Sequence, residues 1–206
     1  MEVPEGYSTL DFKQLLRDSF NLKIKDLSKP EQPTLILLSR KNTRAFTYED
    51  EMVTMMELLG FRVTIAKPDM MADMDRFAEM VNSCSILVGA HGAGITNFIF
   101  LPEGAVLVQV VGLGIEYLSE ITYAIPARGM GLNYVEYKIE PEESSLLSLY
   151  GKDHPVIVDP ASIEAKGYES VRDVYLRQQN FNIDVARFRR TLVDALGLLG
   201  HPIPLG

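Results

Sequence analysis

The chain has 206 residues, of which 47% are hydrophobic and 23% charged, and its formal net charge is −8. This composition is that of a soluble globular protein with a sizeable core. The acidic balance argues against nucleic acid as a partner, because a duplex-binding face needs a surplus of lysine and arginine. The single cysteine, Cys84, rules out an intrachain disulfide, and no apolar run approaches the ~20 residues that span a bilayer.

The N-terminal residues 1–33 are predicted to form a short helix and a linker. Phe12, Leu15, Leu16 and Phe20 give the helix an amphipathic pattern, and the polar linker ends at Pro30 and Pro33. The first residues, MEVPEGYSTLDF, lack the basic and apolar regions of a signal peptide. We therefore expect no targeting segment here, although a fragment that had lost one would look the same.

From residue 34 onward, predicted strands alternate with predicted helices. Strands are predicted at 34–39, 61–66, 85–90, 105–111 and 133–139. The first of these is a continuous apolar run, and SILVGA at 85–90 is predicted to be a buried strand, as expected where both faces are covered. Helical patterns occur at 47–59, 73–83, 95–100 and 115–124. Thr47 and Asp50 form a capping-box pattern at the start of the first of these helices. Such alternation predicts a doubly wound α/β fold with a parallel sheet.

Two consecutive helical patterns, at 169–179 and 183–198, follow without a strand between them. They predict a helical tail that packs across the sheet. We expect three parts: an N-terminal helix and linker at 1–33, a Rossmann-like nucleotide-sugar-binding domain at 34–160, and a helical tail at 161–206 on the same domain.

The strongest local signal is the turn GAHGAGITN at 89–97, after the third predicted strand. Its glycines and alanines leave bare backbone that can approach a ligand closely and adopt positive φ. The helix that begins near Ile95 directs free N–H groups and its positive dipole end at the turn, the usual setting for a phosphate. His91, Thr96 and Asn97 can add side-chain hydrogen bonds. The alternative is a tight turn without a ligand.

The glycine spacing of this turn does not favour NAD. The dinucleotide fingerprint is G-x-G-x-x-G after the first strand, whereas these glycines stand at 89, 92 and 94 after the third.

A second signal is the basic cluster Ser39-Arg40-Lys41 with Arg44, after the first predicted strand. Ligands of open α/β sheets bind at the carboxyl ends of strands, and arginine can clamp a diphosphate through two hydrogen bonds. The alternative is a solvated basic loop. Because both signals follow strands, they lie on the same edge of the sheet, which favours the joint interpretation.

Other polar residues give weaker signals. The D-x-D pattern of Asp73 and Asp75 opens a predicted helix, where acids usually serve the cap and the dipole, so we expect no metal. Glu103 stands in a turn and can contact a ribose hydroxyl or only solvent, and Glu116 has the same two interpretations. His154 is expected to make a structural hydrogen bond, and Cys84 to lie in the core. No nucleophile is evident, and the catalytic residues stay unassigned.

Several segments together resemble glycosyltransferase family 61. VGAHGAGITNFIFLPEGAVLVQVV resembles the core signature of that family, and LILLSRKNTR looks like its strand-Ser-Arg segment. EYLSEITYAIPARGMGLNYVEYKIEPEESSLLSLYGKDHPVIVDP, VYLRQQNFNID and RFRRTLVDAL look like the plant branch that adds xylose or arabinose to xylan. The resemblance extends from about residue 7 to residue 198.

The resemblance implies an inverting, metal-independent enzyme of the GT-B kind, anchored in the Golgi membrane with its catalytic part in the lumen. The C-terminal lobe of such an enzyme binds the UDP-sugar, and the acceptor is a polysaccharide or glycan. This chain would be that lobe, without the anchor, without membrane contact of its own, and without most of the N-terminal lobe. The candidate donor-binding residues are Ser39, Arg40, Arg44, Gly89, His91, Gly92, Ala93, Gly94, Thr96, Asn97 and Glu103.

Two alternatives remain beside an inverting glycosyltransferase or its donor domain. One is a catalytically silent module that binds a nucleotide or nucleotide-sugar and pairs with another chain. Under the resemblance itself, a chain without the N-terminal lobe would be a truncated gene model, a fragment or a degenerate copy. The other, a cytosolic epimerase or NAD-type enzyme, is disfavoured by the glycine spacing. No cofactor or metal is expected in any glycosyltransferase interpretation.

Overall fold

The computed structural model describes residues 6–27 and 32–202, and it is an α/β fold built on a parallel five-stranded sheet. The strand order is β2-β1-β3-β4-β5, and every neighbouring pair is parallel. The strands are β1 (Thr34–Leu38), β2 (Arg62–Ala66), β3 (Ile86–Ala90), β4 (Val106–Val111) and β5 (Asn133–Lys138). Each predicted strand is confirmed to within one residue at either end. β3 and β4 are buried along their whole length, as their continuous apolar runs require.

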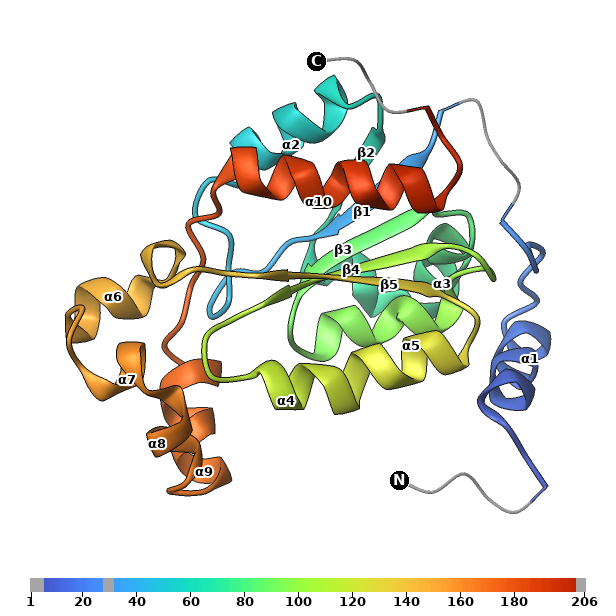
Figure 1. Cartoon of the computed structure of the whole chain (residues 1–206). Coiled ribbons are helices and arrows are strands. Elements are labelled where there is room, and N and C mark those ends of the chain that lie inside the picture. Colours follow the sequence, from blue (N-terminus) through green and yellow to red (C-terminus); the bar gives the residue numbers. More distant parts are fainter. Residues whose placement is uncertain (1–5, 28–31, 203–206) are drawn as a thin grey trace.

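Helices cover both faces of the sheet, which confirms the α/β layering (Figure 1). One face packs against α2 and α10, and the other against α3, a 3₁₀ helix and the α4–α5 segment. The helices on the first face are α2 (Glu49–Leu58) and α10 (Val185–Leu198). Those on the second face are α3 (Met74–Asn82), the 3₁₀ helix Ala93–Phe100, α4 (Glu116–Ser119), a π turn Glu120–Ala124 and α5 (Ile125–Gly129). α1 (Thr9–Ser19) packs against the end of this second layer.

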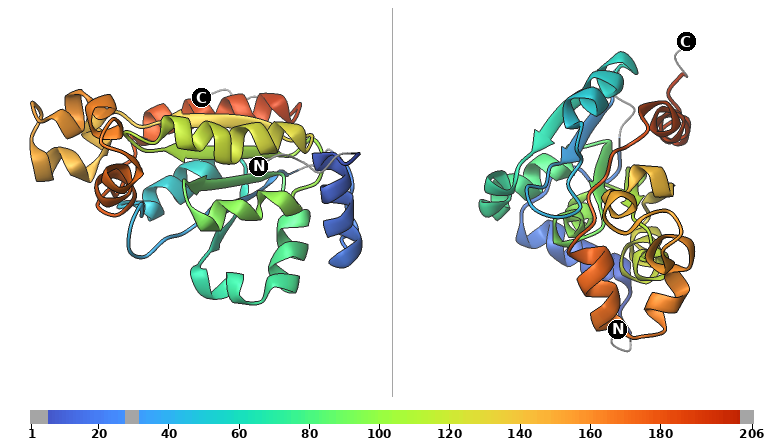
Figure 2. Two further views of the ribbon diagram at one scale, coloured as in Figure 1. Left: turned by 90° about the horizontal axis from the view of Figure 1, so that it is seen from below. Right: turned by 90° about the vertical axis from the view of Figure 1, so that its left-hand side faces the viewer.

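Different helices lie at the two ends of the sheet, as Figures 1 and 2 show. Short helices lie beyond the carboxyl ends of the strands, and α1 lies beyond the amino ends. The short helices are α6 (Ser145–Tyr150), α7 (Pro155–Val158), α8 (Pro160–Glu164), α9 (Tyr168–Val171) and a π turn Arg172–Leu176. The strand order reverses between β1 and β3, and open α/β sheets bind ligands in the crevice at such a point.

Three local predictions differ from the structure. The capping box of Thr47 and Asp50 is wrong, because α2 follows Tyr48 without a side-chain cap. Thr47 is instead held by its own N–H, which donates to the carbonyl oxygen of Phe181 at 2.8 Å. The predicted helix at 95–100 begins earlier, as a 3₁₀ helix at Ala93. The pattern at 115–124 continues through a π turn into α5.

The N-terminal helix is α1, which begins after Ser8 with a capping box formed by Ser8 and Asp11. Leu16 packs against the core, whereas Phe12 and Leu15 are largely exposed. Part of the predicted linker, including Pro30, lies outside the described residues. Within the ranges that the structure describes, no helix is both long and apolar enough to cross a bilayer.

Candidate functional site

The glycine-rich turn leaves β3 at the carboxyl edge of the sheet and enters the 3₁₀ helix Ala93–Phe100. Gly92 precedes this helix with φ +143° and ψ 178°, a conformation that is essentially restricted to glycine. Within residues 6–27 and 32–202, the N–H groups of Gly92, Ala93 and Gly94 have no hydrogen-bond acceptor. Free N–H groups at the start of a helix attract anions. The backbone of this turn therefore has the geometry of an anion site.

Two guanidinium groups lie against the turn, which brings the two sequence signals together. A Cβ atom on Gly92 would lie 2.7 Å from Nη1 of Arg40 and 3.3 Å from Nη1 of Arg44. Both arginines follow β1, which is the neighbour of β3 in the sheet. The Nε of Arg40 donates a hydrogen bond of 2.8 Å to the carbonyl oxygen of Thr43, which orients its guanidinium.

Protein carboxylates do not compensate the charge of these two arginines. In the described part of the chain, neither Arg40 nor Arg44 forms an ion pair. Burial lowers the pKa of both groups, and the charge of Arg40 lowers the pKa of Arg44 further, but guanidinium groups stay protonated. Because both guanidinium groups lie near the same point of the turn, their positive charges repel each other. A bound anion would remove this repulsion.

His91 lies in the core beneath the turn, with 7% of its surface exposed. Its Nδ1 is 3.1 Å from Oγ of Ser119 and 3.4 Å from Nε2 of Gln109. Because Oε1 of Gln109 accepts a hydrogen bond from the hydroxyl of Tyr134, its amide nitrogen faces the imidazole. This network assigns Nδ1 as an acceptor and places the proton of the neutral ring on Nε2.

The surroundings of His91 keep it neutral at pH 7. Burial is the largest cause, and together with the charges of Arg44 and Arg40 it lowers the pKa of His91 to about 4. The ring also makes an edge-to-face contact with Tyr123, with centroids 5.0 Å apart. A neutral imidazole with an occupied Nδ1 can donate a single hydrogen bond, through Nε2. The structure thus gives His91 a supporting place under the turn that the sequence did not reveal.

Tyr123, in the π turn Glu120–Ala124, fixes the orientation of the Gly92–Ala93 peptide. Its hydroxyl donates a hydrogen bond of 2.9 Å to the carbonyl oxygen of Gly92. In a trans peptide the C=O and the following N–H point in opposite directions. Holding the carbonyl oxygen of Gly92 therefore turns the N–H of Ala93 toward the opposite side.

Sequence reasoning missed Tyr123, Gln109 and Ser119. Gln109 left a readable signal, because it is a polar residue inside the apolar run AVLVQVV, and buried polar groups require hydrogen-bond partners. Tyr123 left none, since its helix is apolar on several sides and the contact depends on tertiary structure.

Three other predicted residues lie at the turn in different roles. Asn97 is buried, and its Nδ2 donates to the carbonyl oxygen of Gly94 at 2.8 Å, so it braces the 3₁₀ helix. Gly89 allows close packing, because a Cβ there would lie 2.9 Å from Cδ1 of Leu38 on β1. Thr96 is exposed beside the turn.

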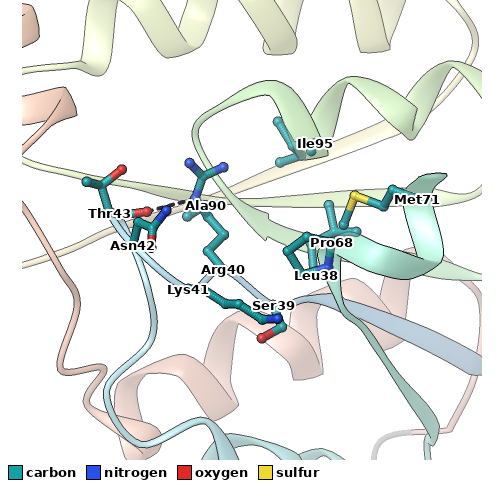
Figure 3. Close-up of a pocket in the computed structure, with 11 residues that line it drawn as sticks. Leu38, Ser39, Arg40, Lys41, Asn42, Thr43, Pro68, Met71, Ala90 and Ile95 are labelled. Atoms are coloured by element: carbon teal, nitrogen blue, oxygen red, sulfur yellow. Dashed lines mark hydrogen bonds between the residues drawn. The ribbon is translucent and has the colours of Figure 1, made fainter.

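A cavity of about 400 Å³ opens beside the arginines, between the loop after β1 and the 3₁₀ helix (Figure 3). The predicted residues Ser39, Arg40 and Gly94 line it. Figure 3 shows Arg40 on one side of the cavity, and Pro68 and Met71 on another. The walls combine apolar and polar groups, namely Leu38, Pro68, Met71, Ala90 and Ile95 with Ser39, Arg40, Lys41, Asn42, Thr43 and Gly94. A site of this mixed character suits a small organic ligand.

The chain matches known proteins over nearly its whole length. The family model described as Glycosyltransferase 61 matches residues 5–108, a range that contains both arginines and the turn. The chain belongs to glycosyltransferase family 61. Similar members include an alpha-1,3-arabinosyltransferase of Oryza sativa subsp. japonica (37% identity over 95% of this chain and 35% of the relative). A xylan glycosyltransferase of Arabidopsis thaliana is 37% identical over 88% of this chain and 37% of the relative. A beta-1,2-xylosyltransferase of Oryza sativa subsp. japonica is 39% identical over 96% of this chain and 43% of the relative.

This family 61 chain spans 35 to 43% of the length of these three relatives. The similarity therefore covers one part of each relative. The described part of the chain contains no group of three or more His, Cys, Asp or Glu residues arranged to hold a metal ion.

Two predicted residues of the family 61 chain lie away from the turn. Glu103 stands before β4, at the amino edge of the sheet, where its N–H donates to the carbonyl oxygen of Lys25 at 2.8 Å. The structure therefore does not bring it together with the other candidates. Lys41 is exposed on the rim of the cavity, 3.8 Å from a carboxylate oxygen of Asp69. Such an exposed pair contributes little to stability.

The remaining polar residues have structural roles. The carboxylate of Asp73 accepts a hydrogen bond of 3.2 Å from the N–H of Arg76, which confirms that it caps α3. His154 accepts from the N–H of Val156 at 3.2 Å, as predicted for a structural histidine. Cys84 is buried, and burial raises the pKa of its thiol to about 12. Glu116 is the exposed first residue of α4.

Proposed function

We propose that this chain is the donor-binding part of an inverting glycosyltransferase that transfers a pentose from a UDP-sugar to a xylan-type polysaccharide or glycan. One observation carries the proposal: two guanidinium groups without a carboxylate partner among the described residues lie against Gly92, in the turn with the free N–H groups of residues 92–94 and where the strand order reverses. The pentose and the xylan come from the relatives, which are named as arabinosyl-, xylosyl- and xylan glycosyltransferases.

The turn and the arginines would act on the diphosphate of the donor. Backbone N–H groups donate to its oxygens, and Arg40 and Arg44 offer paired donors in a planar arrangement. When the bond between the sugar and UDP breaks, negative charge builds up on the diphosphate. The same groups then stabilise the transition state more than the ground state. Because two cations and a helix start supply the positive charge, we propose that neither a metal ion nor a cofactor is needed.

The cavity beside Arg40 would hold another part of the donor. It adjoins both the Arg40 guanidinium and Gly94, and Pro68 and Met71 give it apolar walls. A planar nucleobase can pack on such walls while polar groups of the loop after β1 meet the ribose. We assign no residue as the base that activates the acceptor hydroxyl.

Calorimetric titration of UDP tests the proposal. Arg40→Ala and Arg44→Ala should each weaken UDP binding roughly tenfold to a hundredfold, because each removes charge-assisted hydrogen bonds. Arg62→Ala is the matched control, since it removes one exposed positive charge at the amino end of β2, on the opposite edge of the sheet. It should change affinity less than threefold. EDTA should have no effect.

Two results of that titration would contradict the diphosphate site. One is the absence of binding at millimolar UDP. The other is an equal loss in all three variants, which would indicate unspecific attraction by positive charge. An effect of EDTA would instead revive a metal role for Asp73 and Asp75.

Activity and location need separate measurements. A panel of UDP-pentoses with xylan oligosaccharides would test transfer, and binding without transfer would favour the silent module. We also propose that the chain works in the Golgi lumen, on the basis of family resemblance alone. Protease protection of the tagged chain in intact Golgi vesicles, abolished by detergent, is the expected result. Cleavage in intact vesicles would contradict it.

A further inference from the structure

Residues 178–184, here called the strap, connect the π turn Arg172–Leu176 with α10 across the carboxyl edge of the sheet. The strap pairs with residues 44–47, the loop that carries Arg44, through four hydrogen bonds. They run from Arg44 N–H to Gln179 O (2.6 Å), Thr47 N–H to Phe181 O (2.8 Å), Phe181 N–H to Ala45 O (2.9 Å) and Ala45 N–H to Oδ1 of Asn180 (3.0 Å).

The strap is itself anchored on its other side. The N–H of Asn180 donates to Oγ of Ser145 at 2.9 Å, and the N–H of Ser145 donates to the carbonyl oxygen of Asn180 at 3.0 Å. Further along, the buried carboxylate of Glu143 accepts from the N–H of Asp184 at 2.7 Å and from Tyr137 and Arg187. The strap is therefore bonded to Ser145 and Glu143 on one side and to the loop of Arg44 on the other, so it fixes that loop to the rest of the fold.

Arg44 needs such support for two reasons. Its backbone has φ +57°, the left-handed conformation that is common for glycine but rare for L residues other than asparagine and aspartate. Its guanidinium also lies beside that of Arg40, which repels it. Without external bonds, both effects would favour a loop in which Arg44 turns away from Gly92.

We propose that Asn180 is a positioning residue of the anion site, which holds Ala45 and thereby keeps the guanidinium of Arg44 against Gly92. The inference rests on the proposed function of that site. Three of the four bonds between the strap and the loop use backbone atoms alone, whereas the fourth depends on the Asn180 side chain. Asn180 is thus the position at which a substitution loosens the loop of Arg44 without removing any group that meets the ligand.

The test uses inorganic pyrophosphate as the probe and calorimetry as the measurement. Asn180→Ala should weaken pyrophosphate binding about fivefold to tenfold, the value of one hydrogen bond. Gln178→Ala is the matched control. Gln178 lies two residues before Asn180 in the strap, and its loss removes two side-chain hydrogen bonds, to Tyr150 and Asp173, but none to residues 44–47. This variant should change affinity less than twofold.

A double-mutant cycle separates positioning from a general loss of stability. If Asn180 acts through Arg44, then Asn180→Ala should cause no further loss in an Arg44→Ala background. The same substitution should keep its full effect in an Arg40→Ala background. An equal loss in the Arg44→Ala background, or an unchanged affinity of the single variant, would overturn the proposal.

Amide hydrogen exchange of the ligand-free protein gives a readout that does not depend on binding. Asn180→Ala should speed exchange at Arg44 and Ala45, and Gln178→Ala should not. If the wild-type chain bound no pyrophosphate, the proposed function would fail, and the exchange rates alone would decide the role of Asn180. Unchanged rates at both amides would refute that role even if pyrophosphate bound well.

Discussion

Replacing Gly92 with alanine should damage both the stability of the fold and its anion site. At φ +143° and ψ 178° an L residue is strained, at a cost of about 1–3 kcal/mol. For a chain of this size, 1 kcal/mol corresponds to roughly 2–4 °C in Tm, so we expect a decrease of roughly 2–12 °C. The new Cβ would also lie 2.7 Å from Nη1 of Arg40, too close for that guanidinium to stay. Its displacement should weaken UDP binding about tenfold or more.

Gly94→Ala is the matched control for this prediction, because it adds a methyl group to the same turn. Its Cβ would meet the side chain of Met71 at 3.8 Å, an ordinary contact, and its backbone needs no positive φ. Thermal unfolding should show Gly94→Ala much nearer to the wild type than Gly92→Ala in Tm. If the two variants had the same Tm, the argument from the Gly92 backbone would be refuted, and wild-type UDP affinity of Gly92→Ala would refute the argument from the Arg40 contact.

Three further predictions concern the surroundings of the turn. Because the pKa of His91 is about 4 in the folded chain and near 6.5 in the unfolded chain, the unfolded state binds more protons between these values. The free energy of unfolding should therefore fall as pH decreases through that window, by up to about 1.4 kcal/mol per pH unit from this group. Urea denaturation of the wild type and His91→Gln would check this, and an unchanged pH slope in the variant would contradict it. In Gly112→Ala the new Cβ would overlap Oε1 of the buried Gln179 in the strap, 1.8 Å away, so the variant should lose about 1–3 kcal/mol of stability and bind pyrophosphate more weakly. A wild-type free energy of unfolding together with wild-type pyrophosphate affinity would exclude that packing. Cys84, with a thiol pKa of about 12, should resist iodoacetamide in the native state and react only after unfolding, as mass spectrometry would show.

The strands and the turn were accessible from the sequence because their signals are local. A strand buried on both faces requires a continuous apolar run, so the order of hydrophobic residues alone located β1 and β3. The bare backbone of GAHGAG marked the turn for the same reason, since few other sequences allow a conformation such as that of Gly92. The placement of Arg40 and Arg44 after a strand was enough to put them on the correct edge.

The roles of individual side chains depended on strand order and chain reversal. The sequence indicated that His91 would meet a ligand, but burial against Ser119 and Tyr123 could be seen only once α4 and its continuation were packed on the sheet. Glu103 looked like a neighbour of the turn, twelve residues away from His91. The 3₁₀ helix Ala93–Phe100 instead returns the chain to the opposite edge of the sheet, where β4 begins parallel to β3.

Short-range patterns of residues were sufficient for the layered α/β class, the limits of the strands and the chemical character of one turn. The packing of Arg40 and Arg44 against Gly92, and the bond from Asn180 to Ala45 across 135 residues, appear only in the folded chain. Contacts at such separations depend on how the strands are ordered and how the C-terminal segment returns across them, and no local pattern of residues specifies either.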